Sequence, residues 1–407
     1  MEGQLQLSFI RYKKDSYIIV EGKLNADRFF IIQQGKVGIS REVVVADDDV
    51  SVLNPGDFFG VISTMSAHSH IETAQALTDV VLIAVRKDQY GTLIQKNAQV
   101  AMKIIMQFSK RLRHLNETLA GITLKKTAET GPAQFFVVAE YYFRQRQFSK
   151  AMYGYSNYLK FCPDGANADS AKEHIAKLNS QRITMNKDYG PGDVNRTYKK
   201  DTMLFCEGEP GDELFIIQKG SVKISKVIGD NEVLLAVLKV GDIFGEMALL
   251  EGKPRAASAS AYDECEVVVV NRANFEQMIK TQPQLIAKVT TLLADRIWLI
   301  YRQLANTLIE NPLGRMYDSL LIQLEKNRVS LESTSPYTFS FGQWELANMV
   351  GLPEREANLL LGKMLQNKRI QIINEKIHAV SVGEVTKQVE YFRKMDKIEK
   401  SRKESRA

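Results

Sequence analysis

The octapeptide FIIQKGSV at residues 215–222 decides the fold, because the chain carries a close copy of it, FIIQQGKV, at residues 30–37. The offset between the two is 215 − 30, or 185 residues. GDIFG at residues 241–245 repeats GDFFG at residues 56–60 with the same offset, since 241 − 56 is again 185. A constant offset indicates a repeated structural unit rather than chance similarity. The sequence therefore predicts two copies of one domain.

Each copy contains short apolar segments separated by turn residues. In the second copy, Gly220 and Gly241 divide such segments, and many short strands with glycine turns predict a β-roll or barrel. Residues 283–306 instead predict an amphipathic helix, because apolar residues recur there at three- and four-residue spacing. We expect a β-roll followed by a long helix in each copy, with residues 99–119 as the first such helix.

The chemistry lies in one stretch of the second copy, FGEMALLEGKPRAAS at residues 244–258. Gly245 lets the backbone approach a ligand closely, and residues 246–250 can form a helical turn whose free N–H groups face an anion. Arg255 adds a permanent charge with a fork of donors suited to a phosphate. Glu246 can accept a hydrogen bond from a sugar hydroxyl. These residues together predict a phosphate cradle.

This stretch closely resembles the phosphate-binding cassette of cyclic nucleotide-binding domains, and the resemblance extends over residues 199–306. In that family the glutamate binds the ribose 2′-hydroxyl and the arginine binds the cyclic phosphate, which implies these roles for Glu246 and Arg255. Ala256 follows the arginine where cGMP-selective members often carry a hydroxyl, so the resemblance favours cAMP as the effector. It also implies ligand contacts from the neighbouring Gly245, Met247, Ala248, Ala256 and Ala257.

The adenine base of such a ligand normally meets the long helix. Constant spacing places Trp298 and Tyr301 there, and an aromatic ring can stack on a base. The alternative interpretation is that both side chains only pack a helix interface.

The first copy departs from the cassette pattern. At the offset of 185, the positions of Glu246 and Arg255 are Val61 and His70, so the sugar acceptor and the permanent cation are both missing. His68 and His70 lack the nearby carboxylate or cysteine cluster of a metal site, and we predict no metal. We expect the first copy to have the same fold without the ligand.

Aromatic residues recur at helical spacing between the copies, and Pro163 ends that pattern before a further helix. Residues 132–180 therefore resemble one and a half tetratricopeptide-type repeats, which could dock on the adjacent β-roll or on a protein partner. A plain helical linker is the alternative.

A third module follows residue 311. The pattern predicts a helix at residues 343–350, a turn at 351–353, a helix at 354–366 and a hairpin at 370–382. This order resembles the winged helix-turn-helix at the DNA-binding end of the bacterial cAMP-receptor-protein (Crp/Fnr) family.

DNA binding by this module would use the second helix and the hairpin. Arg355 and Asn358 can read guanine and adenine edges, whereas Glu354 and Glu356 would repel phosphates, so we expect weak binding. The expected phosphate contacts come from the basic residues Lys368, Arg369 and Lys376. Residues 387–407 carry eight basic and four acidic residues and are expected to be a solvated helix or disordered.

The composition is that of an ordinary globular chain, with 44% hydrophobic and 25% charged residues among 407 and a net charge of +6. No apolar run approaches the length of a membrane helix. Three distant cysteines indicate a reducing cytoplasm. The sequence shows no nucleophile–base pair, metal cluster or nucleotide-triphosphate loop, so we predict a binding protein that is not an enzyme and has no catalytic cofactor.

We therefore expect a mixed α+β chain with a degenerate cyclic nucleotide-binding domain at residues 1–120, a tetratricopeptide-like insert at 132–180, an intact domain at 195–310, a winged helix-turn-helix at 311–386 and a charged tail at 387–407. The expected function is a cyclic-nucleotide-responsive, DNA-binding transcription regulator. The alternative is a signalling regulator that acts through protein partners without DNA. The two long helices can pair within one chain as a pseudo-dimer, which we favour, or between chains as a homodimer.

Overall fold

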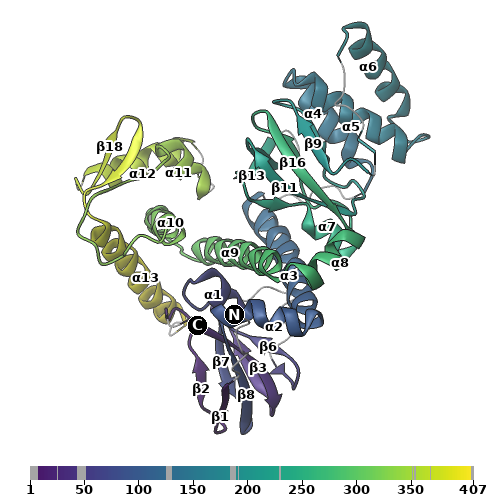
Figure 1. Ribbon diagram of the computed structural model, residues 1–407. Helices are drawn as coiled ribbons and strands as arrows, with labels where there is room; N and C mark the ends of the chain where they lie inside the picture. Colours follow the sequence, from purple (N-terminus) through teal and green to yellow (C-terminus); the bar gives the residue numbers. More distant parts are fainter. Residues whose placement is uncertain are drawn as a thin grey trace. The chain divides into compact units, whose positions relative to one another are not determined.

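A computed structural model describes residues 8–24, 26–43, 52–124, 131–183, 189–190, 192–228, 231–350, 352, 354–366 and 368–404 (Figure 1). The described residues form two compact units by their internal contacts. One unit lies within residues 88–293, and the other joins residues 8–87 to residues 294–404.

The first copy is a β-roll of two four-stranded antiparallel sheets. Their strand orders are β1-β8-β3-β6 and β2-β7-β4-β5. The elements are β1 (Ser8–Tyr12), β2 (Tyr17–Ile19), β3 (Arg28–Gln34), β4 (Val37–Ser40), β5 (Val52–Leu53), β6 (Phe58–Phe59), α1 (Val61–Ser66), β7 (Thr73–Ala76) and β8 (Val80–Arg86). Apolar side chains of both sheets fill the space between them.

The second copy repeats this arrangement strand for strand. Its sheets have the orders β14-β11-β16-β9 and β10-β15-β12-β13. The elements are β9 (Asn195–Tyr198), β10 (Met203–Phe205), β11 (Glu213–Lys219), β12 (Val222–Ile228), β13 (Asn231–Leu238), β14 (Ile243–Phe244), α7 (Glu246–Glu251), β15 (Ser258–Ala261) and β16 (Cys265–Asn271). Phe30 pairs with Phe59 in the first roll, and Phe215 pairs with Phe244 in the second, so even the strand register keeps the offset of 185.

Helices follow each roll, as predicted. The first roll is followed by α2 (Tyr90–Lys96) and α3 (Ala98–Leu124), and the second by α8 (Arg272–Thr281) and α9 (Pro283–Thr307). Within the unit of residues 88–293, α3 packs against α7 and α8, and α2 packs against α8. The hydroxyls of Tyr90 and Thr290 lie 3.1 Å apart in the same contact region. The long helix of the first copy therefore covers the β-roll of the second.

The insert between the copies consists of α4 (Gln134–Arg144), α5 (Phe148–Phe161) and α6 (Ala168–Ser180). The aromatic residues that recur at helical spacing are mostly buried in one cluster, which also contains Met203, Cys206 and Val227 of the second roll. The apolar face of this helical insert is therefore covered by the outer face of the β10-β15-β12-β13 sheet. Figure 1 shows α4 and α5 beside this roll.

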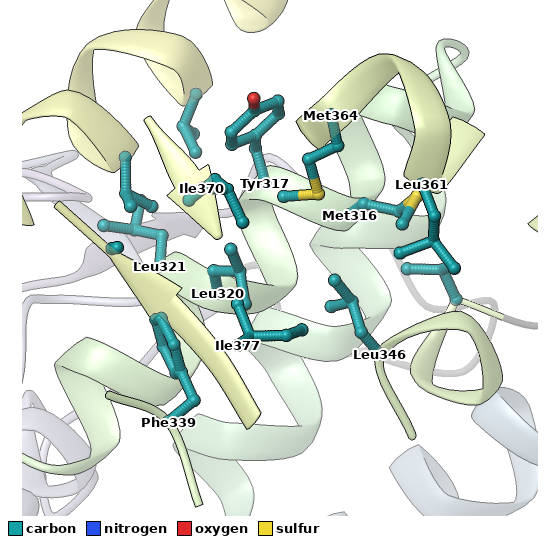
Figure 2. Packing of buried hydrophobic residues seen from close by; sticks show 14 of the residues in the cluster. Met316, Tyr317, Leu320, Leu321, Phe339, Leu346, Leu361, Met364, Ile370 and Ile377 are labelled. Atoms are coloured by element: carbon teal, nitrogen blue, oxygen red, sulfur yellow. The ribbon is translucent and has the colours of Figure 1, made fainter. Parts of the chain in front are cut away.

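The C-terminal module contains α10 (Pro312–Lys326), β17 (Tyr337–Thr338), α11 (Gln343–Met349), α12 (Glu354–Gln366), β18 (Ile370–Ile373), β19 (Lys376–Ala379) and α13 (Val382–Glu404). Asn311 caps α10 by accepting hydrogen bonds from the backbone N–H groups of Leu313 and Gly314. Figure 2 shows the core, in which Leu320 and Leu321 of α10 pack against α12 and the hairpin. The predicted turn residues Gly351 and Pro353 lie outside the described residues.

Helix α13 bears out the helical alternative for residues 387–404, most of which are exposed, but it begins earlier than residue 387 and is partly buried. The helix begins at Val382 and buries Val385, Val389 and Phe392 against the core of the module. A side chain at position 314 of α10 would come within 2.9 Å of Phe392, so Gly314 permits this close packing. The eight basic residues of positions 387–407 made the apolar stripe of this helix difficult to recognise in the sequence, because the stripe lies mostly before residue 393.

No described helix is long and apolar enough to cross a membrane. The described residues also contain no group of three or more histidine, cysteine or carboxylate side chains that could hold a metal ion.

Candidate functional site

The predicted cassette lies between β14 and β15 of the second roll. Gly245 begins α7 with a φ of 77°, and Gly252 ends it with a φ of 65°, a region that favours glycine. A Cβ at position 245 would lie 2.7 Å from Nη1 of Arg255. Glycine is therefore required at position 245 both for the turn and for the approach of the arginine.

Arg255 is the centre of the site. Its side chain is 6% exposed, and Nη1 donates to the carbonyl oxygens of Glu213 and Gly245, both at 2.7 Å. The guanidinium lies over the ring of Phe205, 4.3 Å from the centroid. Nε has no hydrogen-bond partner among the described residues, and a side chain at Gly211 would clash with it. Part of the guanidinium donor set is thus buried without an acceptor.

The electrostatics of this pocket follow from burial. Burial lowers the pKa of Arg255, and the nearby carboxylates of Glu209, Glu213 and Glu246 oppose that change. A guanidinium remains protonated in this situation. Burial raises the pKa of Glu209, whose backbone oxygen accepts from the N–H of Arg255 at 2.8 Å. The unsatisfied Nε donor favours an incoming hydrogen-bond acceptor, because a buried donor without a partner is costly.

The other residues expected to contact the ligand lie on α7 or directly after Arg255 in the sequence. Glu246 is 2% exposed and Ala248 is 1% exposed, whereas Met247, Ala256 and Ala257 are half-buried. The structure brings Gly245 and Arg255 into direct contact through a hydrogen bond.

Trp298 and Tyr301 lie on α9. Trp298 stacks on His68 of the first roll, with ring centroids 3.9 Å apart and an interplanar angle of 16°. The hydroxyl of Tyr301 donates to Oε1 of Glu21 at 2.8 Å and accepts from the N–H of Val43 at 3.1 Å. Both side chains therefore contact the first roll, as the alternative interpretation of a packed helix interface expects, and their role at a bound base stays a prediction.

Helix α3 covers the second cassette instead, a contact that sequence reasoning missed. Ser109 Oγ and Arg113 Nε donate to the two carboxylate oxygens of Glu251, both at 2.9 Å. Arg113 Nη1 also donates to the carbonyl of Pro254 at 3.2 Å. Adding the offset of 185 to Arg113 gives Trp298, so equivalent positions of the two long helices contact opposite rolls. The offset of 185 relates Arg113 to Trp298 in the sequence. This relation would have indicated the contact only if each long helix had been expected to pack on the β-roll of the other copy.

The first cassette is filled by its own side chains. Glu72 is 6% exposed and accepts from the N–H of Gly60 at 3.0 Å and from Arg41 Nη2 at 2.8 Å. At the offset of 185 Glu72 becomes Ala257, so only the first copy places this carboxylate near the start of its short helix. Burial lowers the pKa of His68 to about 4, helped by the charges of Arg328 and Lys87, and leaves a neutral ring against Trp298.

The residues expected to meet DNA lie on α12 and the hairpin. Arg355, Asn358 and Glu356 are exposed on one helix, and Lys368 and Lys376 are exposed near the hairpin. Arg369 forms an ion pair with Glu384, with Nη1 2.7 Å from Oε2. The side chain of Glu354 lies outside the described residues.

Known proteins resemble the chain most clearly in the two rolls. Residues 9–97 and 195–282 both match the family described as cyclic nucleotide-binding domain. The chain is 28% identical over 175 residues to the CRP-like cAMP-activated global transcriptional regulator of Mycobacterium tuberculosis, which covers 43% of this chain and 78% of that protein. It is 29% identical over 175 residues to the cAMP-activated global transcriptional regulator CRP of Pasteurella multocida, over 42% and 83% of the two chains. A solved CRP/FNR-family transcriptional regulator from Thermus thermophilus is similar at a TM-score of 0.36 and 20% identity, over 48% of this chain and 98% of that one.

Proposed function

Since the chain carries two cyclic nucleotide-binding domains, we propose that it is a transcription regulator whose effector is a cyclic nucleotide, and that cAMP is this effector. The observation that carries the proposal is Arg255, a buried cation in the second cassette with a donor that no described residue satisfies. The Mycobacterium tuberculosis and Pasteurella multocida relatives are cAMP-activated regulators, and Ala256 of this chain offers no hydroxyl that would favour guanine.

In this proposal the second domain holds the ligand. Arg255 binds the cyclic phosphate through its free donor, and Glu246 accepts from the ribose 2′-hydroxyl. Charge-assisted contacts of this kind are about twice as strong as neutral hydrogen bonds. The short loop from Glu251 to Arg255 then connects the ligand to α3, because Ser109 and Arg113 hold Glu251. The long helix of the first copy thereby senses occupancy of the second.

The first domain takes no nucleotide in this proposal. Glu72 already accepts from the N–H of Gly60 and from Arg41, and a second anion beside this carboxylate would be repelled. The positions of Glu246 and Arg255 are Val61 and His70 in this copy. We therefore propose one ligand per chain.

The output in this proposal is DNA binding by the C-terminal module, as a winged helix-turn-helix. Helix α11 ends at Met349, α12 begins at Glu354, and β18 and β19 form an antiparallel hairpin. Arg355 and Asn358 are exposed on α12 and available to base edges. A gel shift with genomic fragments tests this: cAMP should increase the retarded fraction, and no retardation at low salt with or without cAMP would exclude the DNA role.

A second candidate output is docking of a protein partner. Leu359 of α12 is 62% exposed, and Ile372 and Ile373 of β18 are 38% and 41% exposed. Exposed apolar side chains at these positions do not favour phosphates and fit a protein surface better. A failed gel shift together with cAMP binding would favour this output.

A further inference from the structure

The insert and the second roll line a partly open cavity of about 300 Å³, separate from the cassette. The N-terminal end of α5 forms one wall, and the outer face of the β10-β15-β12-β13 sheet with the turn before β10 forms the other. The lining residues are Gln147, Lys150, Lys200, Asp201, Lys223, Ser260, Ala261 and Tyr262. Arg255 and Glu246 are not among them, so this space does not belong to the site described above.

The charge in the cavity is basic. Three lysines and one aspartate line it. Lys150 is 1% exposed, and its Nζ lies 3.9 Å from Oδ1 of Asp201, a carboxylate that is itself mostly exposed. Burial lowers the pKa of Lys150 and the charge of Lys223 lowers it further, whereas the carboxylates of Glu232 and Asp201 oppose this change. A buried ammonium that is only partly compensated favours a further anion.

Glu232, a half-buried carboxylate close to these lysines, is already engaged. Glu232 accepts from Lys223 at 2.8 Å, from the hydroxyl of Tyr142 at 2.8 Å and from Ser225 at 2.7 Å. It therefore compensates Lys223 directly and also stabilises the charge of Lys150, so the ammonium of Lys150 is only partly compensated.

Uncharged polar groups in the cavity also lack partners. Ser260 is 2% exposed, and its Oγ has no hydrogen-bond partner among the described residues. Oε1 of Gln147 is buried without a partner in the same part of the chain. Buried polar groups in native proteins are nearly always hydrogen-bonded, so these atoms point to a ligand. Alternation along β15 explains the placement, because Ala259 and Ala261 pack into the core of the roll while Ser260 faces the insert.

We propose that this cavity binds a small phosphate-bearing molecule, with Lys150, Lys200 and Ser260 as the groups that bind the phosphate oxygens. Interfaces between modules are common places for small-molecule sites, and about 300 Å³ is at the small end of the usual range. The ligand class is therefore a phosphorylated metabolite of sugar-phosphate size. The proposal of an anion in this cavity does not rest on the proposal that the cassette binds cAMP.

Helix α5 links this cavity to the phosphate loop of the cassette. On the same helix as Lys150, Tyr153 donates to Glu209 at 2.9 Å and Asn157 donates to it at 3.1 Å. Glu209 in turn accepts from the backbone of Arg255. An anion that fixes α5 would thereby bias the loop that holds Arg255, so the two ligands should change each other's affinity by the same factor.

The test titrates pyrophosphate, and separately glucose 6-phosphate, into the full chain by calorimetry at constant ionic strength. An Arg255→Ala background removes anion binding by the cassette. We expect one site per chain in this background. Lys150→Met should weaken it about ten- to a hundredfold, the loss expected for one charge-assisted contact, and Ser260→Ala about two- to tenfold.

The matched control is Lys172→Met, which removes an exposed lysine from α6 of the same insert and should leave the affinity unchanged. Thermal unfolding of each variant checks folding, and Ser260→Ala serves as the mild variant if Lys150→Met does not fold. The proposal is overturned if no heat is detected up to about 10 mM of either probe. It is also overturned if the Lys150 and Ser260 variants bind as the Lys172 variant does.

Discussion

Replacement of Arg255 by alanine should remove most of the cyclic nucleotide affinity of the chain. The side chain is 6% exposed and presents a buried donor, so a bound cyclic phosphate would gain a charge-assisted contact shielded from water. Loss of such a contact costs about 1.5–3 kcal/mol. Since about 1.4 kcal/mol corresponds to tenfold in affinity, cAMP should bind about ten- to a hundredfold more weakly. Isothermal titration of the full chain measures this directly.

The same loop supplies a matched control. Lys253 lies two residues away, its side chain is 60% exposed, and Lys253→Ala should leave the affinity almost unchanged. Arg255→Ala also deprives the carbonyls of Glu213 and Gly245 of a donor, so thermal unfolding must show that the variant is folded. Equal affinities for the two variants, or two equivalent sites per wild-type chain, would refute the assignment of the ligand to Arg255.

Four further outcomes are expected. Glu251→Gln should weaken the hydrogen bonds between α3 and the cassette and lower the cAMP affinity about two- to tenfold. Calorimetry measures this affinity, and an unchanged value would show that these contacts of α3 do not affect ligand binding. His68 has a pKa of about 4 in the folded chain, below its ordinary value of 6.5, so its contribution to stability is present above pH 6.5 and is lost as the pH falls towards 4. His68→Phe keeps a ring against Trp298 but cannot be protonated. Urea unfolding at pH 6.5 and pH 4 should therefore show a loss of stability that is about 2 kcal/mol smaller for this variant than for the wild-type chain. An identical pH profile of the two proteins would contradict the assignment of this loss to His68. Glu354→Gln with Glu356→Gln should tighten binding to any DNA, and Lys368→Ala should lower the salt slope by about 1; nanomolar binding of the wild-type chain to a palindrome at physiological salt would contradict weak binding. Light scattering should give a monomer, and a dimer lost on substitution of Leu293 and Ile297 would favour pairing between chains instead.

The repeat offset predicted most of the fold, because a β-roll is a short-range pattern of strands and glycine turns. Gly60 and Gly245 even share the same φ of 77°, as expected of equivalent turns. The cassette was indicated by the resemblance of residues 244–258 to that of cyclic nucleotide-binding domains, and the roles of Glu246 and Arg255 stay predictions.

Long-range packing was not predictable in the same way. Trp298 occupies its expected helix but contacts His68, because the sequence does not say which roll a long helix covers. The sequence did not predict the pairing of Glu72 with Arg41, because the two residues are 31 positions apart. Val385, Val389 and Phe392 were hidden by the charged residues around them, although their spacing is helical.

The exchange of helices between the copies has a consequence for dissection of the chain. A fragment that begins after residue 131 retains the second roll but loses α3, and with it Ser109 and Arg113. Glu251, whose side chain is 3% exposed in the intact chain, would then face water with its two hydrogen bonds broken. If the second domain binds the proposed ligand, an isolated second domain should therefore bind it differently from the intact chain, because the loop from Glu251 to Arg255 would lose its contacts with α3.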